Sequence, residues 1–172
     1  MIYTLTGAMG SGKSTVGRLL TARHGWAFVD LDLLIAETAG KSIPEIFREC
    51  GENGFRDAET RALEDAVTAY EGGTMILSLG GGTLLREENR FIVRTVSHCI
   101  YLRATAATLA ARLREQADGR PLLQGEGSLE TKIGRILADR SAIYEAAATR
   151  IVDTDGKTPA QVADEVEKLL YL

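Results

Sequence analysis

A chain of 172 residues, of which 45% are apolar and 26% charged, is long enough to bury the core of one globular domain, and no second domain is needed. Its formal net charge of -4 argues against a general nucleic-acid binder, which concentrates basic charge on one face. No run of about eighteen apolar residues occurs, and Met1 leads directly into a strand-like segment. We therefore expect a cytoplasmic protein that binds neither nucleic acid nor membrane.

The first elements are predicted to be strand, loop, helix and strand. Residues 2–6 have the composition of a short buried strand, and a glycine-rich turn separates them from an amphipathic helix over residues 14–24. A second strand follows over residues 26–30.

A capped helix start is predicted next. Ser42 and Glu45 have the spacing of a capping box, and Pro44 stands inside the first turn, where proline is tolerated. A longer helix is predicted over residues 53–70.

Three further strands, over residues 74–79, 98–102 and 150–153, are separated by helical patterns. Strands that alternate with helices pair in parallel through crossover connections, so both faces of the sheet are covered by helices. The sequence therefore predicts a single α/β domain over residues 1–172.

Residues 116–128 interrupt the helical pattern with glycines and a single proline. Loops of this length in compact domains are either functional lids or disordered insertions. We expect a mobile lid over about residues 116–127.

The segment GAMGSGKS, residues 7–14, matches the P-loop pattern and lies between a predicted strand and a predicted helix. Glycines let the backbone turn so that successive N–H groups point inward, and the following helix presents its positive dipole end to phosphate. Lys13 would bridge the β- and γ-phosphates of ATP, and the hydroxyl of Ser14 would ligate Mg2+. The residues of this loop expected to bind the nucleotide are Gly10, Ser11, Gly12, Lys13, Ser14 and Thr15.

P-loops serve ATPases, GTPases and small-molecule kinases, so other residues must identify the phosphoryl acceptor. The Asn-Lys-x-Asp motif by which GTPases read their base is absent. Asp30 and Asp32 end the second predicted strand, and period-two alternation would place both carboxylates on one side, one toward the Mg2+ water shell and one toward a substrate hydroxyl. A helix N-cap followed by a solvated acid is the alternative.

Other candidate residues each allow two interpretations. The glycines of residues 80–82 would let backbone amides approach a bound molecule, or would form only a tight turn. Arg56 could bind substrate or be an exposed helix residue paired with Glu59, and Arg140 has the same ambiguity. Arg120, inside the predicted lid, could stabilise charge on the transferring phosphoryl group.

Several blocks together resemble the shikimate kinase family over residues 7–159. The matching blocks are the P-loop, residues 28–32, 40–47, 51–59, 78–82 and 120–123, and Arg140 with Tyr144 and Glu145. Leu79 and residues 141–143 depart from the usual family pattern without touching a group assigned chemistry. The resemblance implies a three-layer P-loop NTPase fold with five parallel strands in the order 2-3-1-4-5, and a monomer.

The same resemblance implies ATP-dependent phosphorylation of the 3-hydroxyl of shikimate, giving 3-phosphoshikimate and ADP. Asp32 would bind the ring hydroxyls and could accept a proton, while Arg56 and Arg140 would grip the substrate carboxylate. The remaining substrate contacts would come from Gly80, Gly81 and Gly82.

For the nucleotide, the resemblance implies that Asp30 holds the water shell of Mg2+ and that Arg120 contacts the ATP phosphates from the lid. Residues 153–159 would border the adenine, with Lys157 and Pro159 in contact. An arginine opposite that segment is also implied, and Arg112 ranks before Arg114.

Two rival functions remain open. A kinase for another small hydroxy acid, such as gluconate, would keep Lys13 and Ser14 but change the acceptor residues. A non-catalytic module could instead use ATP as a conformational switch for a protein partner, although every expected catalytic position is filled.

Overall fold

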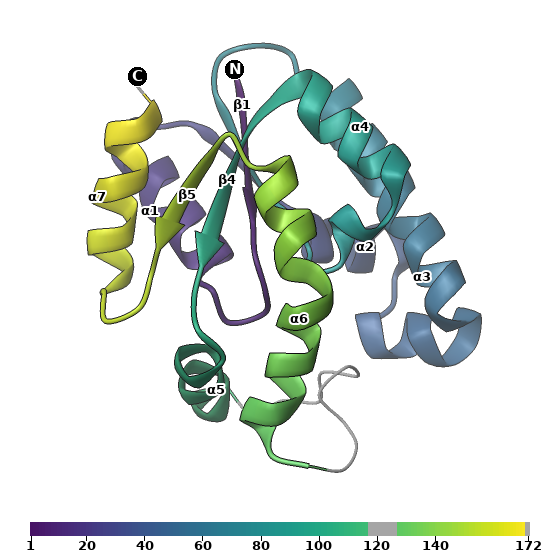
Figure 1. Ribbon diagram of the computed structural model, residues 1–172. Helices are drawn as coiled ribbons and strands as arrows, with labels where there is room; N and C mark the ends of the chain where they lie inside the picture. The colour runs from purple at the N-terminus through teal and green to yellow at the C-terminus, as the bar shows by residue number, and fades with distance from the viewer. Residues whose placement is uncertain (117–126, 171–172) are drawn as a thin grey trace.

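The computed structural model describes residues 1–116 and 127–170 of the chain (Figure 1). The predicted lid, apart from its end residues Gln116 and Gly127, therefore lies outside the described residues, and so does Arg120. Within the described part of the chain, no helix has both the length and the apolarity needed to span a membrane.

A five-stranded sheet forms the centre of the molecule, with strand order β2-β3-β1-β4-β5 and parallel pairing throughout. This confirms the predicted fold class and strand order. The strands are β1 (Ile2–Thr6), β2 (Ala27–Asp30), β3 (Met75–Ser78), β4 (Ser97–Arg103) and β5 (Arg150–Asp153). Because all five run in one direction, their carboxyl ends meet at a single edge, at the bottom of Figure 1.

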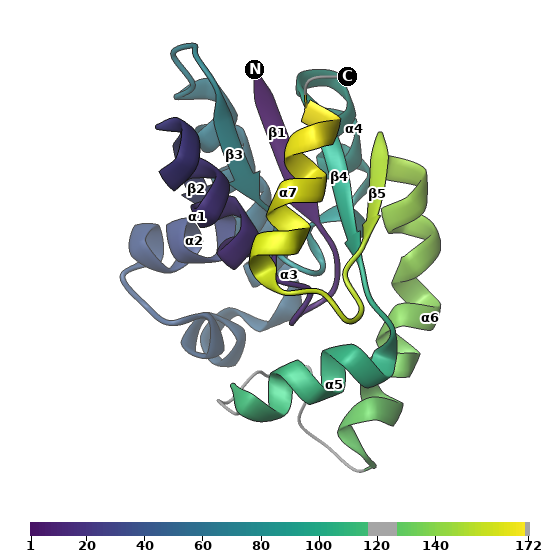
Figure 2. The same cartoon turned by 90° about the vertical axis from the view of Figure 1, so that its left-hand side faces the viewer.

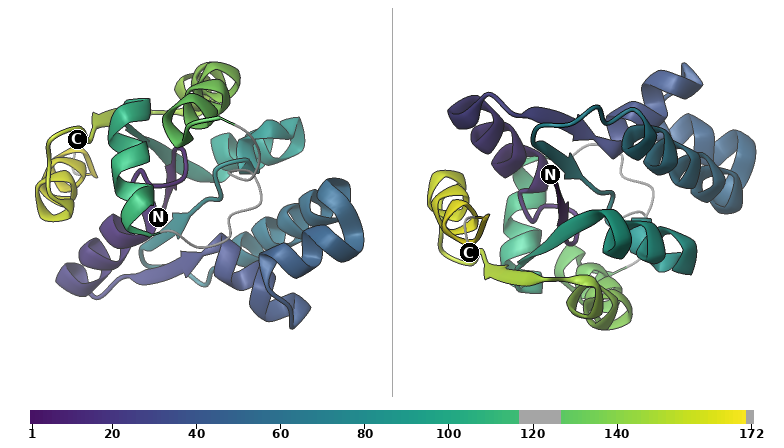
Figure 3. Two further views of the ribbon diagram at one scale, coloured as in Figure 1. Left: turned by 90° about the horizontal axis from the view of Figure 1, so that it is seen from below. Right: turned by 90° about the horizontal axis from the view of Figure 1, so that it is seen from above.

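Helices cover both faces of the sheet, as Figures 2 and 3 show. On one face, α1 (Lys13–His24) packs beside α7 (Pro159–Leu170) over a core that includes Ile76 and Ile100. The opposite face is covered by α3 (Ile43–Thr68), α4 (Glu87–Val96) and α6 (Leu129–Ala147).

The division of the core follows strand geometry. Ile76 belongs to the core on the α1 and α7 side, whereas its neighbour Leu77 belongs to the core on the other side. In the same way, Ile100 and Tyr101 of β4 face opposite layers. Successive side chains of a strand point to opposite faces, so a sheet buried on both sides needs apolar residues at every position.

The capping box predicted at the start of α3 is present. The backbone N–H of Glu45 donates to Oγ of Ser42 at 3.3 Å, and the N–H of Ser42 donates to Oε2 of Glu45 at 3.1 Å. The two helical segments predicted after Ser42 both lie within α3 and are separated at Gly51, whose φ of 70° and ψ of -177° are not helical. A φ in this range favours glycine because other residues rarely adopt it.

One local prediction is wrong: the strand alternation expected from Asp30 to Asp32 does not occur, although the second strand ends at Asp30 as its predicted bounds had it. The strand ends at Asp30, and α2 (Leu31–Ala39) begins at the next residue. The Asp30 carboxylate accepts hydrogen bonds from the backbone N–H groups of Asp32 and Leu33, which caps the new helix. Asp30 and Asp32 are therefore not related by strand alternation, and Asp32 occupies the first turn of a helix.

Two further described elements lie at the edge of the sheet where the strands have their carboxyl ends. A short 3-10 helix, η1 (Thr83–Leu85), follows the three glycines after β3. Helix α5 (Ala106–Glu115) lies across the carboxyl ends of the strands (Figure 1).

Candidate active site

The loop between β1 and α1 has the backbone of a phosphate cradle. Gly7, Gly10 and Gly12 have φ values of 144°, 82° and 94°, which side chains with a Cβ rarely adopt. Space is limiting as well, because a Cβ on Gly7 would lie 2.6 Å from the carbonyl oxygen of Leu102. No described side chain caps the start of α1, so its amides and the positive end of its dipole suit an anion.

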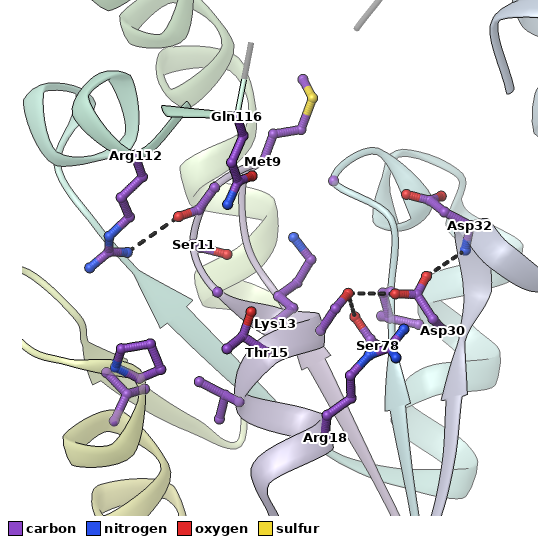
Figure 4. A pocket seen from close by; sticks show the side chains of 18 of the residues that line it. Met9, Ser11, Lys13, Thr15, Arg18, Asp30, Asp32, Ser78, Arg112 and Gln116 are labelled. Atoms are coloured by element: carbon purple, nitrogen blue, oxygen red, sulfur yellow. Dashed lines mark hydrogen bonds between the residues drawn. The ribbon is translucent and has the colours of Figure 1, made fainter. Parts of the chain in front are cut away.

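Lys13 is held inside this loop. Its side chain is 9% exposed, and Nζ donates to the carbonyl oxygens of Gly7 at 2.9 Å and Ala8 at 3.1 Å. Figure 4 shows its ammonium group directed into the space that the loop encloses. A cation buried beside free helix amides gives this space a strongly positive character.

Oxygen atoms of three residues meet beside the cradle (Figure 4). Oγ of Ser14 donates to Oδ2 of Asp30 at 2.5 Å, and Oγ of Ser78 lies 3.4 Å from Oγ of Ser14. Hydroxyl and carboxylate oxygens are ligands that suit Mg2+ or its bound waters. The position of Ser78, the last residue of β3, depends on how β1, β2 and β3 pair, so sequence reasoning gave it no role.

The three glycines after β3 lie where functional side chains converge. A Cβ on Gly80 would lie 2.8 Å from Oδ1 of Asp32, and a Cβ on Gly82 would lie 2.3 Å from Nη2 of Arg56. Neither glycine has a positive φ. A larger residue at either position would therefore displace Asp32 or Arg56, a consequence that the interpretation as a tight turn alone does not include.

Gly81, the middle glycine, lies next to both Arg140 and the phosphate cradle. A Cβ on Gly81 would lie 3.7 Å from Nη1 of Arg140 and 3.8 Å from the carbonyl oxygen of Gly7. Arg140, on α6, is buried. The glycine loop, residues 80–82, thus lies where Asp32, Arg56 and Arg140 meet next to the phosphate cradle.

Arg56 is buried, and the interpretation of it as an exposed helix residue is wrong. Its side chain pairs with Glu59 as the spacing suggested, with Nη1 of Arg56 2.8 Å from Oε1 of Glu59. Oγ1 of Thr83 donates to Oε2 of Glu59 at 2.8 Å, and Nδ2 of Asn89 donates to the carbonyl oxygen of Thr83 at 2.9 Å. The exposed fractions of Arg56 and Glu59 are 6% and 0%. A chain of buried hydrogen bonds therefore holds the guanidinium group.

Arg112, near the end of α5, joins the P-loop to the segment after β5. Its guanidinium donates to the carbonyl oxygen of Gly10 at 3.3 Å, and to Oγ1 and the carbonyl oxygen of Thr154 at 3.0 and 2.8 Å. Arg112 lines the pocket, whereas Arg114 is exposed and does not line it. The geometry favours Arg112, as the sequence ranking did.

Lys157 and Pro159 line the pocket beside Arg112. Nζ of Lys157 donates to the carbonyl oxygen of Asp153 at 2.7 Å and lies 2.8 Å from Oε1 of Glu165. The ammonium group is thus engaged within its own loop and helix, and the backbone and methylene groups of Lys157 are the parts suited to contact a base.

These residues surround a cavity of about 570 Å³, a size typical of small-molecule sites. The predicted residues that line it are Gly10, Ser11, Gly12, Lys13, Ser14, Thr15, Asp30, Asp32, Gly81, Arg112, Lys157 and Pro159. Gly80, Gly82, Arg56 and Arg140 adjoin it through the glycine loop.

A P-loop at the edge of a five-stranded parallel sheet, facing an acid and two buried guanidinium groups, defines a small-molecule kinase of the P-loop class. A sequence model described as shikimate kinase matches residues 9–171, and the chain belongs to that family.

Curated relatives and solved structures agree with this assignment. The chain is 44% identical to shikimate kinase of Geobacter metallireducens and 40% identical to that of Marinomonas sp., in each case over 94% of this chain and 87% of the relative. A structure of shikimate kinase from Acinetobacter baumannii in complex with shikimate superposes with a TM-score of 0.90 at 32% identity, covering 99% of this chain and 92% of that one. Shikimate kinase from Bacteroides thetaiotaomicron gives a TM-score of 0.88 at 30% identity, covering 100% and 99%.

Proposed function

We propose that the protein transfers the γ-phosphoryl group of ATP to the 3-hydroxyl of shikimate, giving 3-phosphoshikimate and ADP. The observation that carries the proposal is the convergence of Asp32, Arg56 and Arg140 on the glycine loop beside the phosphate cradle. A related structure at 32% identity was solved in complex with shikimate, which supports the same acceptor.

The acceptor pocket suits a small ring that carries one carboxylate and several hydroxyls. Arg56 and Arg140 supply two guanidinium forks, which bind carboxylate with paired hydrogen bonds. The carboxylate of Asp32 accepts hydrogen bonds from ring hydroxyls and orients the one that attacks. The close approach of Gly80, Gly81 and Gly82 to these side chains leaves backbone, rather than side chain, facing the ring.

Phosphoryl transfer proceeds through a loose transition state with in-line attacking and leaving oxygens. Positioning and charge stabilisation therefore matter more than the basicity of Asp32, which takes the hydroxyl proton as the bond forms. Lys13 stabilises charge on the β- and γ-phosphates from within the cradle. Arg120, which lies outside the described residues, is proposed to contact the same phosphates.

Mg2+ is the proposed cofactor, with Ser14 as its protein ligand and Asp30 holding its waters. The cluster of Ser14, Asp30 and Ser78 oxygens fits such an ion. Among the described residues, no group of three or more acidic, histidine or cysteine side chains could hold a metal ion. Bound together with ATP, the ion would take its other ligands from phosphate oxygens and water. When bound, Mg2+ neutralises charge on the phosphates.

The adenine is proposed to lie between Arg112 and the segment that contains Lys157 and Pro159. We further propose that residues 1–172 form a single domain that acts as a monomer in the cytoplasm.

A coupled assay of ADP release, run with and without shikimate, tests the proposal. Release should depend on shikimate and should be lost in Lys13→Met, and gluconate and other hydroxy acids should not replace shikimate. Turnover with gluconate alone would favour the rival kinase, and ATP binding without turnover of any hydroxy acid would favour a non-catalytic module.

A further inference from the structure

Tyr144 is buried between helix α6 and the glycine loop. It lies one helical turn after Arg140 and is 1% exposed. The centroid of its ring is 5.1 Å from the centroid of the Tyr101 ring. Its hydroxyl donates to the carbonyl oxygen of Gly81 at 2.5 Å. The function proposed above gives this hydroxyl no part.

The hydroxyl of Tyr144 is kept in its neutral, donating form. Burial raises its pKa to about 12, and the positive charge of Arg140 offsets this only in part. A neutral phenol can donate one hydrogen bond and accept another. The oxygen donates to Gly81, and it lies close enough to Arg140 for the positive charge of that guanidinium to act on it. The Tyr144 hydroxyl therefore lies between the backbone of the glycine loop and one of the two guanidinium groups.

The hydrogen bond to Gly81 also orients the next amide. No cis peptide bond occurs in the described chain, and in a trans peptide the C=O and N–H groups point in opposite directions. Fixing the carbonyl of Gly81 toward Tyr144 therefore directs the N–H of Gly82 away from α6. Neither the amide of Gly81 nor that of Gly82 donates to another described residue, so these amides contribute little to holding the loop in place.

We infer that Tyr144 is a positioning residue for the substrate carboxylate, because its hydroxyl holds the Gly81–Gly82 peptide in one arrangement beside the Arg140 guanidinium before substrate binds. The inference rests on the proposed function and adds a residue to it. Without the hydroxyl, two consecutive glycines have wide backbone freedom. The peptide must then be ordered when substrate binds, which weakens binding.

Tyr144→Phe tests the inference, because it removes one oxygen and keeps the ring that packs in the core. Tyr101→Phe is the matched control: its ring is the neighbouring one, it is equally buried, and its hydroxyl makes no hydrogen bond to the glycine loop among the described residues. For each variant, we would measure KM for shikimate and for ATP, kcat, the calorimetric Kd for shikimate, and Tm.

Wild-type turnover of shikimate is established first, so that failure of the proposed function is recognised independently of either variant. Tyr144→Phe should raise KM and Kd for shikimate about tenfold, as expected for loss of one buried hydrogen bond. KM for ATP should stay within about twofold, and Tyr101→Phe should change neither constant by more than that. Unchanged shikimate binding, a parallel rise in both KM values, an equal effect in Tyr101→Phe, or a variant that does not fold would overturn the inference.

Discussion

Glu59 and Arg56 form an ion pair in the interior of the protein, with 2.8 Å between Oε1 and Nη1. The second carboxylate oxygen of Glu59 accepts from Thr83, a residue of the segment that follows the glycine loop. Glu59 therefore holds the substrate-binding guanidinium on one side and the loop on the other.

Glu59→Gln should weaken shikimate binding and lower stability. Loss of the carboxylate leaves the buried charge of Arg56 without compensation, which typically costs about 3 kcal/mol. KM for shikimate should rise at least about tenfold, because the guanidinium is no longer held in place. Steady-state kinetics and urea unfolding measure the two effects.

Glu52→Gln is the matched control. Glu52 lies on the same helix, 3.8 Å from Nη2 of the same Arg56, but its side chain is 58% exposed. Exposed ion pairs contribute at most about 1 kcal/mol, so both measurements should stay near wild type. Equal effects of the two substitutions would contradict the role assigned to Glu59.

Gly82→Ala should impair shikimate binding with little loss of stability. The new Cβ would lie 2.3 to 2.6 Å from the guanidinium atoms of Arg56, which must move. The backbone itself tolerates alanine, since φ is -109° and ψ is 3°. We expect KM for shikimate to rise about tenfold or more while Tm changes by only a few degrees.

Gly134→Ala, on α6, is the control for the added methyl group. Apart from its own helix, no part of the chain that the structure describes lies within 4 Å of its Cβ position, so kinetics should be unchanged. Normal shikimate binding by Gly82→Ala would show that the position of Arg56 does not matter for this substrate.

The two acids after β2 should have separable roles. Asp32→Asn should abolish turnover while ATP affinity stays within about threefold, because Asp32 is proposed to contact only the acceptor. Asp30→Asn should instead raise the Mg2+ concentration needed for half-maximal rate, since Asp30 bonds to Ser14. Nucleotide-binding titrations with and without Mg2+ measure this apart from turnover. An active Asp32→Asn variant would refute its assignment.

Stability should fall at alkaline pH because of Cys99. Burial raises the pKa of its thiol from 9.0 to about 11. The folded state therefore keeps a proton that the unfolded state loses, and between pH 9 and 11 the free energy of unfolding decreases with rising pH. Two pKa units correspond to about 2 to 3 kcal/mol.

Urea unfolding from pH 8 to 11, under reducing conditions, checks this prediction. Cys99→Ala should lose less stability across the range than wild type. Cys50→Ala removes an exposed thiol and should keep the wild-type pH dependence. Identical slopes for wild type and Cys99→Ala would rule out the buried thiol as a source of the alkaline loss.

Local patterns predicted most of the fold. Residues 150–153 were predicted as a strand and form β5, and the capping box at Ser42 and Glu45 forms as expected, because caps and short buried strands depend on nearby residues. The P-loop likewise needs only one strand, one turn and one helix. The alternation predicted for Asp30 and Asp32 failed because N-capping by Asp30 starts a helix.

Tertiary features of the site were beyond sequence patterns. Nothing in the spacing of Arg56 and Glu59 shows that the pair is buried, since an exposed i, i+3 pair looks the same. The contact of Thr83 with Glu59 joins residues 24 positions apart, and that of Tyr144 with Gly81 joins residues 63 apart. Such contacts depend on how the layers pack, which no local pattern encodes.

The identity and position of the phosphorylated hydroxyl test the central claim most directly. Purified protein would be incubated with ATP, Mg2+ and shikimate, and the product analysed by 31P and proton NMR. The account predicts one phosphomonoester, coupled to the proton on carbon 3, formed in equal amount to ADP. Release of inorganic phosphate without an ester, or phosphate on another hydroxyl, would contradict it.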